Sequence, residues 1–82
     1  MKLADRIRQY VIEERIAPTR QAGKGELTVR AGDIHAAMGL DNRMPAVCGA
    51  LDASKFCEKA QVRLIKRSGP HQGATAEWVL GL

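Results

Sequence analysis

The chain has 82 residues, with 13 Lys or Arg against nine Asp or Glu, which gives a formal net charge of +4 at pH 7. This length allows one domain (residues 1–82) with a small core and little room for an enclosed substrate cleft. No apolar run approaches the roughly 18–20 residues that cross a bilayer, and the charged start MKLADRIRQY lacks the apolar core of a signal peptide. We therefore expect a cytoplasmic protein with no membrane partner.

The positive charge is concentrated in the second half of the chain. Residues 1–41 carry seven cations and six anions, whereas residues 42–82 carry six cations and three anions. Such a bias favours a polyanion or an acidic protein surface as partner.

The first predicted element is an amphipathic helix within residues 1–17, which Pro18 is expected to end. Its core face is formed by residues at four-residue spacing, Leu3, Ile7 and Val11, and Arg8 is placed on the opposite, solvent face. Ile12 and Ile16 lie beside this apolar stripe. They either widen the core face or line a dimer contact.

A loop, a short strand and a second helix are expected next. Residues 18–26 contain Pro and Gly and are typical of a loop, whereas residues 26–30 (ELTVR) alternate as a half-buried strand does. Asp33 is placed to cap a helix over 34–38, because its carboxylate can accept a hydrogen bond from a free backbone N–H. Gly39 is expected to end that helix, since Gly adopts the left-handed conformation without steric cost.

A third helix is assigned to residues 42–52 after a tight turn. With Asn42 as the N-cap, Pro45 falls in the first turn, where its missing N–H has no intrahelical partner to lose. Because Pro45 disfavours helical dihedrals at Met44, the helix start can also be as late as Pro45. The following segment is either a continuation or a separate short helix, with Phe56 as its core anchor.

The C-terminal part predicts a β-hairpin, with strands in 61–67 and 74–82 and a turn at 68–73. Val62 and Leu64 are expected to face inward from the first strand. The inward residues expected from the second strand are Ala76, Trp78, Leu80 and Leu82. Trp78 is then the largest single contributor to the core.

This order of elements resembles the winged helix-turn-helix superfamily of DNA-binding proteins. The matching segments are ELTVR, DIHAAM, NRMPAVCGALD and, for the wing, KRSGPHQG. The resemblance implies an α+β fold in which three helices, or four with a short extra one, pack on an antiparallel sheet of two to three strands. It places the helix-turn-helix at about 33–53 and the wing hairpin at about 61–81, and it pairs the strand before the second helix with that hairpin.

The resemblance also implies which residues contact DNA. A recognition helix meets base edges with its N-terminal residues, so Asn42 and Arg43 are the expected readers of adenine and guanine. Other residues of this helix offer only apolar contact or close approach: Met44, Ala46, Gly49 and Ala50. The wing is expected to reach phosphates or the minor groove through Lys66, Arg67, His71 and Gln72. Supporting phosphate contacts are expected from Lys55, Lys59, Arg30 and Thr28.

Plainer interpretations of the same residues stay open. Asn42 alternatively only caps the helix, Arg43 is a solvated charge, and the wing charges only keep an edge strand soluble. Asp41 and Asp52 oppose a tight phosphate interface at the two ends of the third helix, unless they act as caps.

Two function classes follow from these alternatives. The first is a transcriptional regulator or DNA-associated accessory module that binds double-stranded DNA, as a homodimer where the operator is long. The second is a winged-helix protein-interaction module without base readout, in which Ala46, Gly49 and Ala50 let a partner helix pack closely.

An enzyme or metal site is not predicted. Cys48 and Cys57 are nine residues apart, unlike the spacing of zinc ligand pairs. His35 as a base for a Cys48 nucleophile lacks a third, orienting group, and Cys48 is expected to pack beneath the third helix. We expect no cofactor, no metal and no small-molecule substrate.

Overall fold

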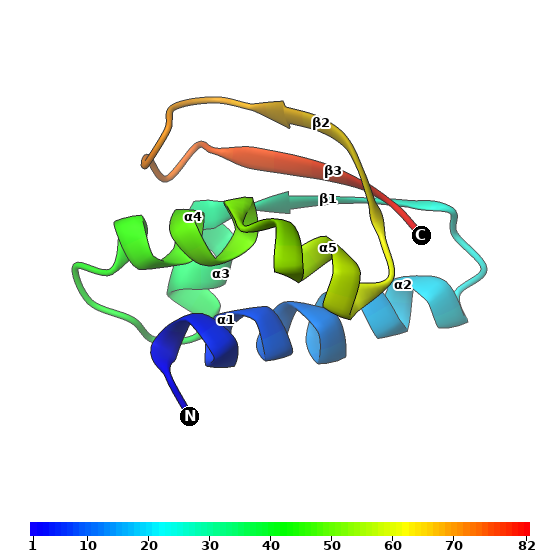
Figure 1. Cartoon of the computed structure of the whole chain (residues 1–82), viewed down its shortest axis with the longest axis horizontal. Helices are drawn as coiled ribbons and strands as arrows, with labels where there is room; N and C mark the ends of the chain where they lie inside the picture. The colour runs from blue at the N-terminus through cyan, green and yellow to red at the C-terminus, as the bar shows by residue number, and fades with distance from the viewer.

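Four helices pack on one face of a three-stranded antiparallel sheet in the computed structural model, which describes residues 1–82 (Figure 1). The first of these helices is continuous and consists of three consecutive segments, α1, η1 and α2. The elements in chain order are α1 (Leu3–Val11), η1 (Ile12–Ile16), α2 (Ala17–Gln21), β1 (Glu26–Arg30), α3 (Ala31–Ala37), α4 (Met44–Asp52), α5 (Ser54–Ala60), β2 (Arg63–Ser68) and β3 (Glu77–Gly81). In Figure 1 the sheet forms one layer, α1 and α2 run along the opposite side, and α3, α4 and α5 lie between them. The predicted α+β class with a small antiparallel sheet is confirmed.

The first helix is longer than expected, because α1, η1 and α2 follow one another without a break to Gln21. The prediction that Pro18 ends the helix is wrong. A proline removes one N–H and its ring crowds the carbonyl four residues earlier. The wider π-helical turn η1 ends two residues before Pro18, with the Ala17 N–H bonded to the Ile12 carbonyl five residues back. We attribute the passage of the helix through Pro18 to this change of hydrogen-bond pattern.

The helix α3 begins at Ala31, directly after β1, and not behind a cap at Asp33. The N–H groups of Ala31 and Gly32 donate at 2.9 Å to backbone carbonyls in the segment just before β3. These bonds satisfy the helix N-terminus, so Asp33 stays exposed in the first turn without a capping bond. The predicted stop at Gly39 is confirmed, because this residue has a φ of +64°.

The sheet has the strand order β1-β3-β2, so β3 is central and β1 pairs with the C-terminal hairpin. Val29 lies opposite Trp78, and Leu27 lies opposite Leu80, on the face that the helices cover. The edge strand β2 shifts register between Leu64 and Lys66. Leu64 is 48% exposed at this edge, so its predicted place in the core is wrong. A bulge and flanking cations are features that protect an edge strand from unwanted pairing.

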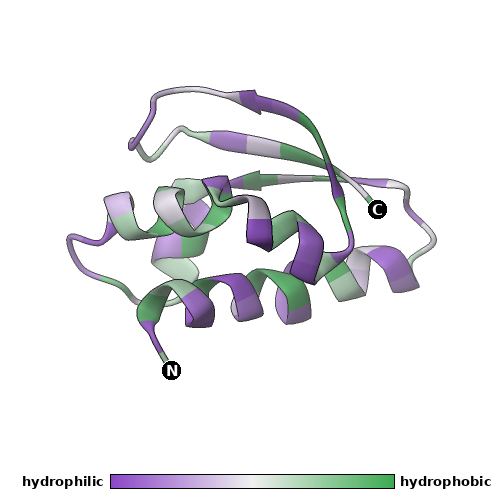
Figure 2. Cartoon of the chain, in the orientation of Figure 1, coloured by the Kyte–Doolittle hydropathy of each residue, from purple (hydrophilic) through white to green (hydrophobic).

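One cluster of 15 buried apolar residues forms the core, and it includes the predicted anchors Phe56 and Trp78. Ile16 is fully buried and Ile12 is partly buried against the cluster, so both widen the core face. Figure 2 shows hydrophobic and hydrophilic segments alternating along α1, as a helix with one buried face requires. None of the helices has the length and apolar character that crossing a bilayer demands.

Arg8 contradicts its predicted place on the solvent face, since it is only 3% exposed. Its guanidinium donates to the Ala50 carbonyl of α4 at 3.0 Å and to the Asp5 carboxylate at 2.9 Å. A carbonyl near the end of a helix needs such a donor, because its own helix supplies none. Arg8 therefore fixes α4 against α1.

Candidate nucleic-acid interface

The turn before α4 presents Asn42 and Arg43 to solvent. Asn42 has a φ of +52°, in the left-handed region, and makes no side-chain hydrogen bond to the helix. The helix begins at Met44, so Arg43 occupies the N-cap position and the interpretation of Asn42 as a cap is wrong. Pro45 falls at the second helical position, where its missing N–H costs no intrahelical bond.

The N-cap position is held by a side chain from the preceding helix. The backbone N–H of Arg43 donates to Nε2 of His35 on α3 at 3.2 Å. The side chains of Asn42 and Arg43 themselves form no hydrogen bond within the chain and stay exposed. Their donors and acceptors are thus free for a ligand.

The solvent face of α4 is narrow and mostly without hydrogen-bonding groups. Pro45, Gly49 and Asp52 are its exposed residues, although the Asp52 side chain itself is only 32% exposed, and Met44 and Ala46 beside them are half-buried. Ala50 is only 2% exposed, so its predicted contact with a ligand is wrong. It faces the α1 side, where Arg8 bonds to its carbonyl. The uncommitted hydrogen-bonding side chains near this face are therefore those of Asn42 and Arg43, just before the helix.

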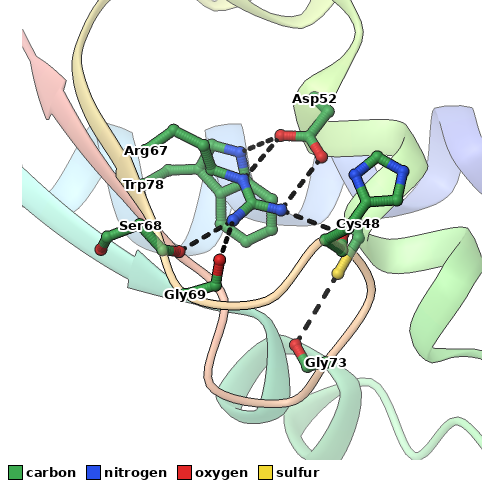
Figure 3. A network of polar contacts seen from close by, with 8 residues as sticks. Cys48, Asp52, Arg67, Ser68, Gly69, Gly73 and Trp78 are labelled. Carbon is green, nitrogen blue, oxygen red and sulfur yellow. Dashed lines mark hydrogen bonds and ion pairs between the residues drawn. The ribbon is translucent and has the colours of Figure 1, made fainter.

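A polar network joins the end of α4 to the base of the wing (Figure 3). The Asp52 carboxylate accepts a hydrogen bond from the Trp78 indole N–H at 2.8 Å and from Nε and Nη2 of Arg67 at 2.9 and 3.2 Å. The Arg67 guanidinium also lies 4.6 Å from the centre of the Trp78 ring, within cation–π range. Asp52 is therefore no helix cap, and we name these three residues the wing latch.

Arg67 has no donor left for a phosphate, which contradicts its predicted role. A guanidinium carries five N–H groups. Two donate to Asp52, and the others donate to the backbone carbonyls of the wing loop: Ser68 at 2.8 Å, Gly69 at 3.5 Å and His71 at 3.0 Å. Figure 3 shows the guanidinium between Asp52 at the helix end and the carbonyls of Ser68 and Gly69. Arg67 thus holds the conformation of the wing loop through hydrogen bonds to its backbone carbonyls.

The ionisation of Asp52 follows from this network. Burial favours the neutral carboxyl, but the hydrogen bonds from Arg67 and Trp78, together with the positive charge of Arg67, outweigh it and hold the pKa of Asp52 below its ordinary value. Asp52 is accordingly charged at neutral pH and pairs fully with the guanidinium.

Both cysteines are free thiols, Cys48 buried and Cys57 partly buried. Cys48 is 1% exposed beneath α4, as predicted, and its Sγ lies 3.8 Å from the Gly73 carbonyl in the wing loop. Burial raises the pKa of the Cys48 thiol, and it also raises the pKa of Cys57. Such thiols are poor nucleophiles because the reactive form is the thiolate. The structure contains no cluster of three or more His, Cys, Asp or Glu side chains that could hold a metal ion.

The predicted wing residues His71 and Gln72 are exposed at the tip of the loop. The contact between Cys48 and Gly73 holds this loop against α4. Figure 1 shows the loop and the N-terminal end of α4 at the same end of the molecule. The polar groups of the wing tip and of the Asn42–Arg43 turn therefore border one surface, which we name the α4–wing surface.

Other predicted contact residues lie on different sides of the molecule. Thr28 and Lys66 pair with Val79, on the sheet face opposite the core residue Trp78. Arg30 on the same outer face is held by Glu77, with two hydrogen bonds of 3.0 and 3.1 Å.

The lysines of α5 lie on another side again. The pKa of Asp5 is lowered first by its hydrogen bond from Arg8 and, to a lesser degree, by the charges of Lys55 and Lys59. The predicted site residue Lys55 is therefore near the start of α1 and does not join the α4–wing surface.

Comparison of the chain with protein-family models, curated proteins and solved structures found no match. The site is therefore interpreted from its own geometry. Sequence reasoning missed the wing latch and the bond from Arg43 to His35. One signal for the latch was present, since a buried indole N–H needs an acceptor. That signal does not identify Asp52, which lies 26 residues earlier in the chain, as the acceptor.

Proposed function

We propose that this chain is a winged-helix protein that binds double-stranded DNA through the α4–wing surface, as a regulator or DNA-associated accessory module. The layout supports this proposal. A strand leads into α3, a tight turn leads into α4, and β1 pairs with a C-terminal hairpin whose loop lies beside α4. This arrangement is compatible with a recognition helix flanked by a wing.

The observation that carries the proposal is the set of uncommitted polar side chains at one end of the molecule. Asn42, Arg43, His71 and Gln72 are exposed, and none of their side chains bonds within the chain. Five of the seven other arginines donate to groups of the protein, namely Arg8, Arg15, Arg20, Arg30 and Arg67. Free donors and acceptors are thus present where a duplex can meet a helix N-terminus and a wing together.

The small exposed side chains on the solvent face of α4 would let this helix come close to the major groove of DNA. A methyl group placed on Gly49 would meet nothing within 4 Å, so the surface there is open. Asn42 and Arg43 are at the helix start, which is the part of a recognition helix closest to base edges. Asparagine pairs with adenine and arginine with guanine, and each such pair gives about 1–3 kcal/mol of discrimination.

The charges predict modest affinity and a shallow dependence on salt. Two cations that no carboxylate engages are Arg43, which lies at this surface, and Lys66, which lies on the outer face of the sheet at the base of the wing. Neutralising about two phosphates gives a slope of about −1.8 in a plot of log affinity against log salt. Affinity is then expected to fall about 12-fold between 50 and 200 mM salt. A homodimer, which presents two such surfaces, suits this small interface best.

The experiment is selection of bound duplexes from a random pool, followed by fluorescence anisotropy titration at several salt concentrations. Arg43→Ala is expected to relax the preference at one base pair, whereas Lys66→Ala is expected to weaken all sequences alike. Each substitution removes one of the two counted cations and is expected to reduce the slope by about 0.9. Lys24→Ala is the matched control, because it removes one exposed charge from the loop after α2, at the opposite end in Figure 1. Equal effects of Arg43→Ala and Lys24→Ala would contradict the proposal.

A second candidate function rests on the same solvent face of α4, which has few hydrogen-bonding groups. Pro45 and Gly49 supply no donor or acceptor from their side chains, which suits a helix of a protein partner as well as a DNA groove. Absence of duplex binding at 50 mM salt would favour this protein-interaction role.

A further inference from the structure

The start of α4 has three backbone N–H groups that its own helix cannot satisfy, because the first four positions lack intrahelical acceptors and one of them is Pro45. No side chain of the turn caps the helix. The N–H of Arg43 is instead taken by the ring of His35 at 3.2 Å. The His35 ring thus provides the side-chain acceptor for the backbone N–H of the N-cap residue Arg43.

The same histidine holds the turn at a second point. The N–H of Leu40 donates to the His35 backbone carbonyl at 3.1 Å, just after Gly39 ends α3. Between Leu40 and Arg43 the chain passes through the left-handed conformation of Asn42, which is uncommon for a residue with a side chain. The bond from the Arg43 N–H to the His35 ring thus closes a short turn whose direction decides where Asn42 and Arg43 point.

We propose that His35 is the positioning residue of DNA recognition in this protein. Its imidazole, protonated on Nδ1, accepts the Arg43 N–H through Nε2 and fixes the Asn42 and Arg43 side chains in front of α4. The tautomer follows from the contact, because a ring nitrogen that accepts a hydrogen bond from an N–H carries no proton. The recognition role rests on the proposed function, whereas the tautomer and the held turn do not.

Two amide substitutions form a matched pair for the test. In His35→Gln the amide oxygen extends far enough to replace Nε2 as the acceptor, whereas the shorter side chain of His35→Asn does not reach the Arg43 N–H. Both side chains are neutral and polar, so the pair differs mainly in reach. Denaturation followed by Trp78 fluorescence verifies that both variants fold.

DNA binding supplies the first readout, measured with the best duplex from the random pool and with a scrambled duplex. His35→Gln is expected to retain wild-type affinity within about twofold, whereas His35→Asn loses about three- to tenfold on the selected duplex, the equivalent of one modest hydrogen bond. Binding to the scrambled duplex and the salt slope are expected to stay unchanged, because no phosphate contact is removed. Equal affinities of the two variants for the selected duplex would overturn the recognition role.

NMR of the free protein supplies the second readout, which needs no DNA. The ring nitrogen shifts of His35 are expected to show a proton on Nδ1, and the Arg43 amide is expected to exchange with solvent faster in His35→Asn than in His35→Gln. A proton on Nε2 in the neutral ring, or equal exchange in the two variants, would overturn the proposed contact. If the wild type binds no duplex, the recognition role fails together with the proposed function, and the NMR result still shows whether His35 holds the turn.

Discussion

Asp52→Ala is expected to lower the free energy of unfolding by about 2 kcal/mol. The change removes the acceptor of the Trp78 N–H, on a residue that is 1% exposed, and leaving a buried donor unpaired costs about 1–3 kcal/mol. It also breaks the ion pair with Arg67, which is worth only about 0.5–1 kcal/mol because both side chains are partly exposed. We take values from the lower part of both ranges, because water can reach the opened site and partly replace the lost acceptor. Their sum is the loss of about 2 kcal/mol stated above.

Urea and thermal denaturation measure this loss directly. Trp78 is the only tryptophan, so its fluorescence reports on the latch itself as well as on unfolding. For a domain of this size a loss of about 2 kcal/mol lowers the melting temperature by about 8–16 °C. Asp52→Asn keeps one acceptor oxygen and is expected to lose about 1 kcal/mol, the energy of a typical hydrogen bond.

The matched control is Asp33→Ala, which removes an exposed carboxylate that caps nothing. Its effect is expected to stay within about 0.5 kcal/mol of wild type, as is usual at surface positions. An Asp52→Ala protein as stable as Asp33→Ala would refute the assignment of the latch as the connection between α4 and the wing.

Three further outcomes follow from the same contacts. Because the folded-state pKa of Asp52 is lowered, its stabilisation is present above the ordinary carboxyl pKa of about 3.9 and is lost as the pH falls through the lower folded value. Denaturation from pH 7 to pH 2 is therefore expected to show the wild type approaching Asp52→Asn in stability at the acid end, and a constant gap would contradict this. Gly69→Ala is expected to destabilise by about 1–3 kcal/mol, because φ is +84° and the added Cβ would lie 2.5 Å from the Thr75 carbonyl oxygen. Gly49→Ala is expected to stabilise by about 0.5–1 kcal/mol in the same urea assay, because the site is helical and open; a loss there would show that the α4 face is not free.

Local patterns in the sequence predict part of this fold. The alternation of residues 26–30 gives β1 with the observed bounds, and Gly39 ends α3 at the expected place. Phe56 and Trp78 are core residues because large apolar side chains at inward positions have nowhere else to pack. These features depend on neighbouring residues, which is why one sequence is enough to infer them.

Features that depend on contacts between distant residues cannot be predicted from local sequence patterns. The helix passes Pro18 because of a π-helical turn that no propensity indicates. Arg8 looks like a surface charge until α4 places a carbonyl over it.

Some residues of the candidate site can likewise be predicted from local sequence, whereas others depend on contacts between distant residues. Asn42 and Arg43 can be found from their place before a helix, and the structure leaves them free. Arg67 cannot be separated from a phosphate-binding arginine until the fold brings Asp52, 15 residues away in the chain, against it. Ala50 is likewise assigned to the wrong face of α4, since the sequence does not show which side of this apolar helix packs on α1.

Binding of a selected duplex by the wild type and by Arg43→Ala, measured as a function of salt, tests the central claim most directly. We expect wild-type binding with a slope of about −1.8, and an Arg43→Ala protein that binds more weakly and loses its preference at one base pair. No binding by the wild type at 50 mM salt, or an Arg43→Ala protein with unchanged affinity and base preference, would contradict the account of the α4–wing surface as a DNA interface.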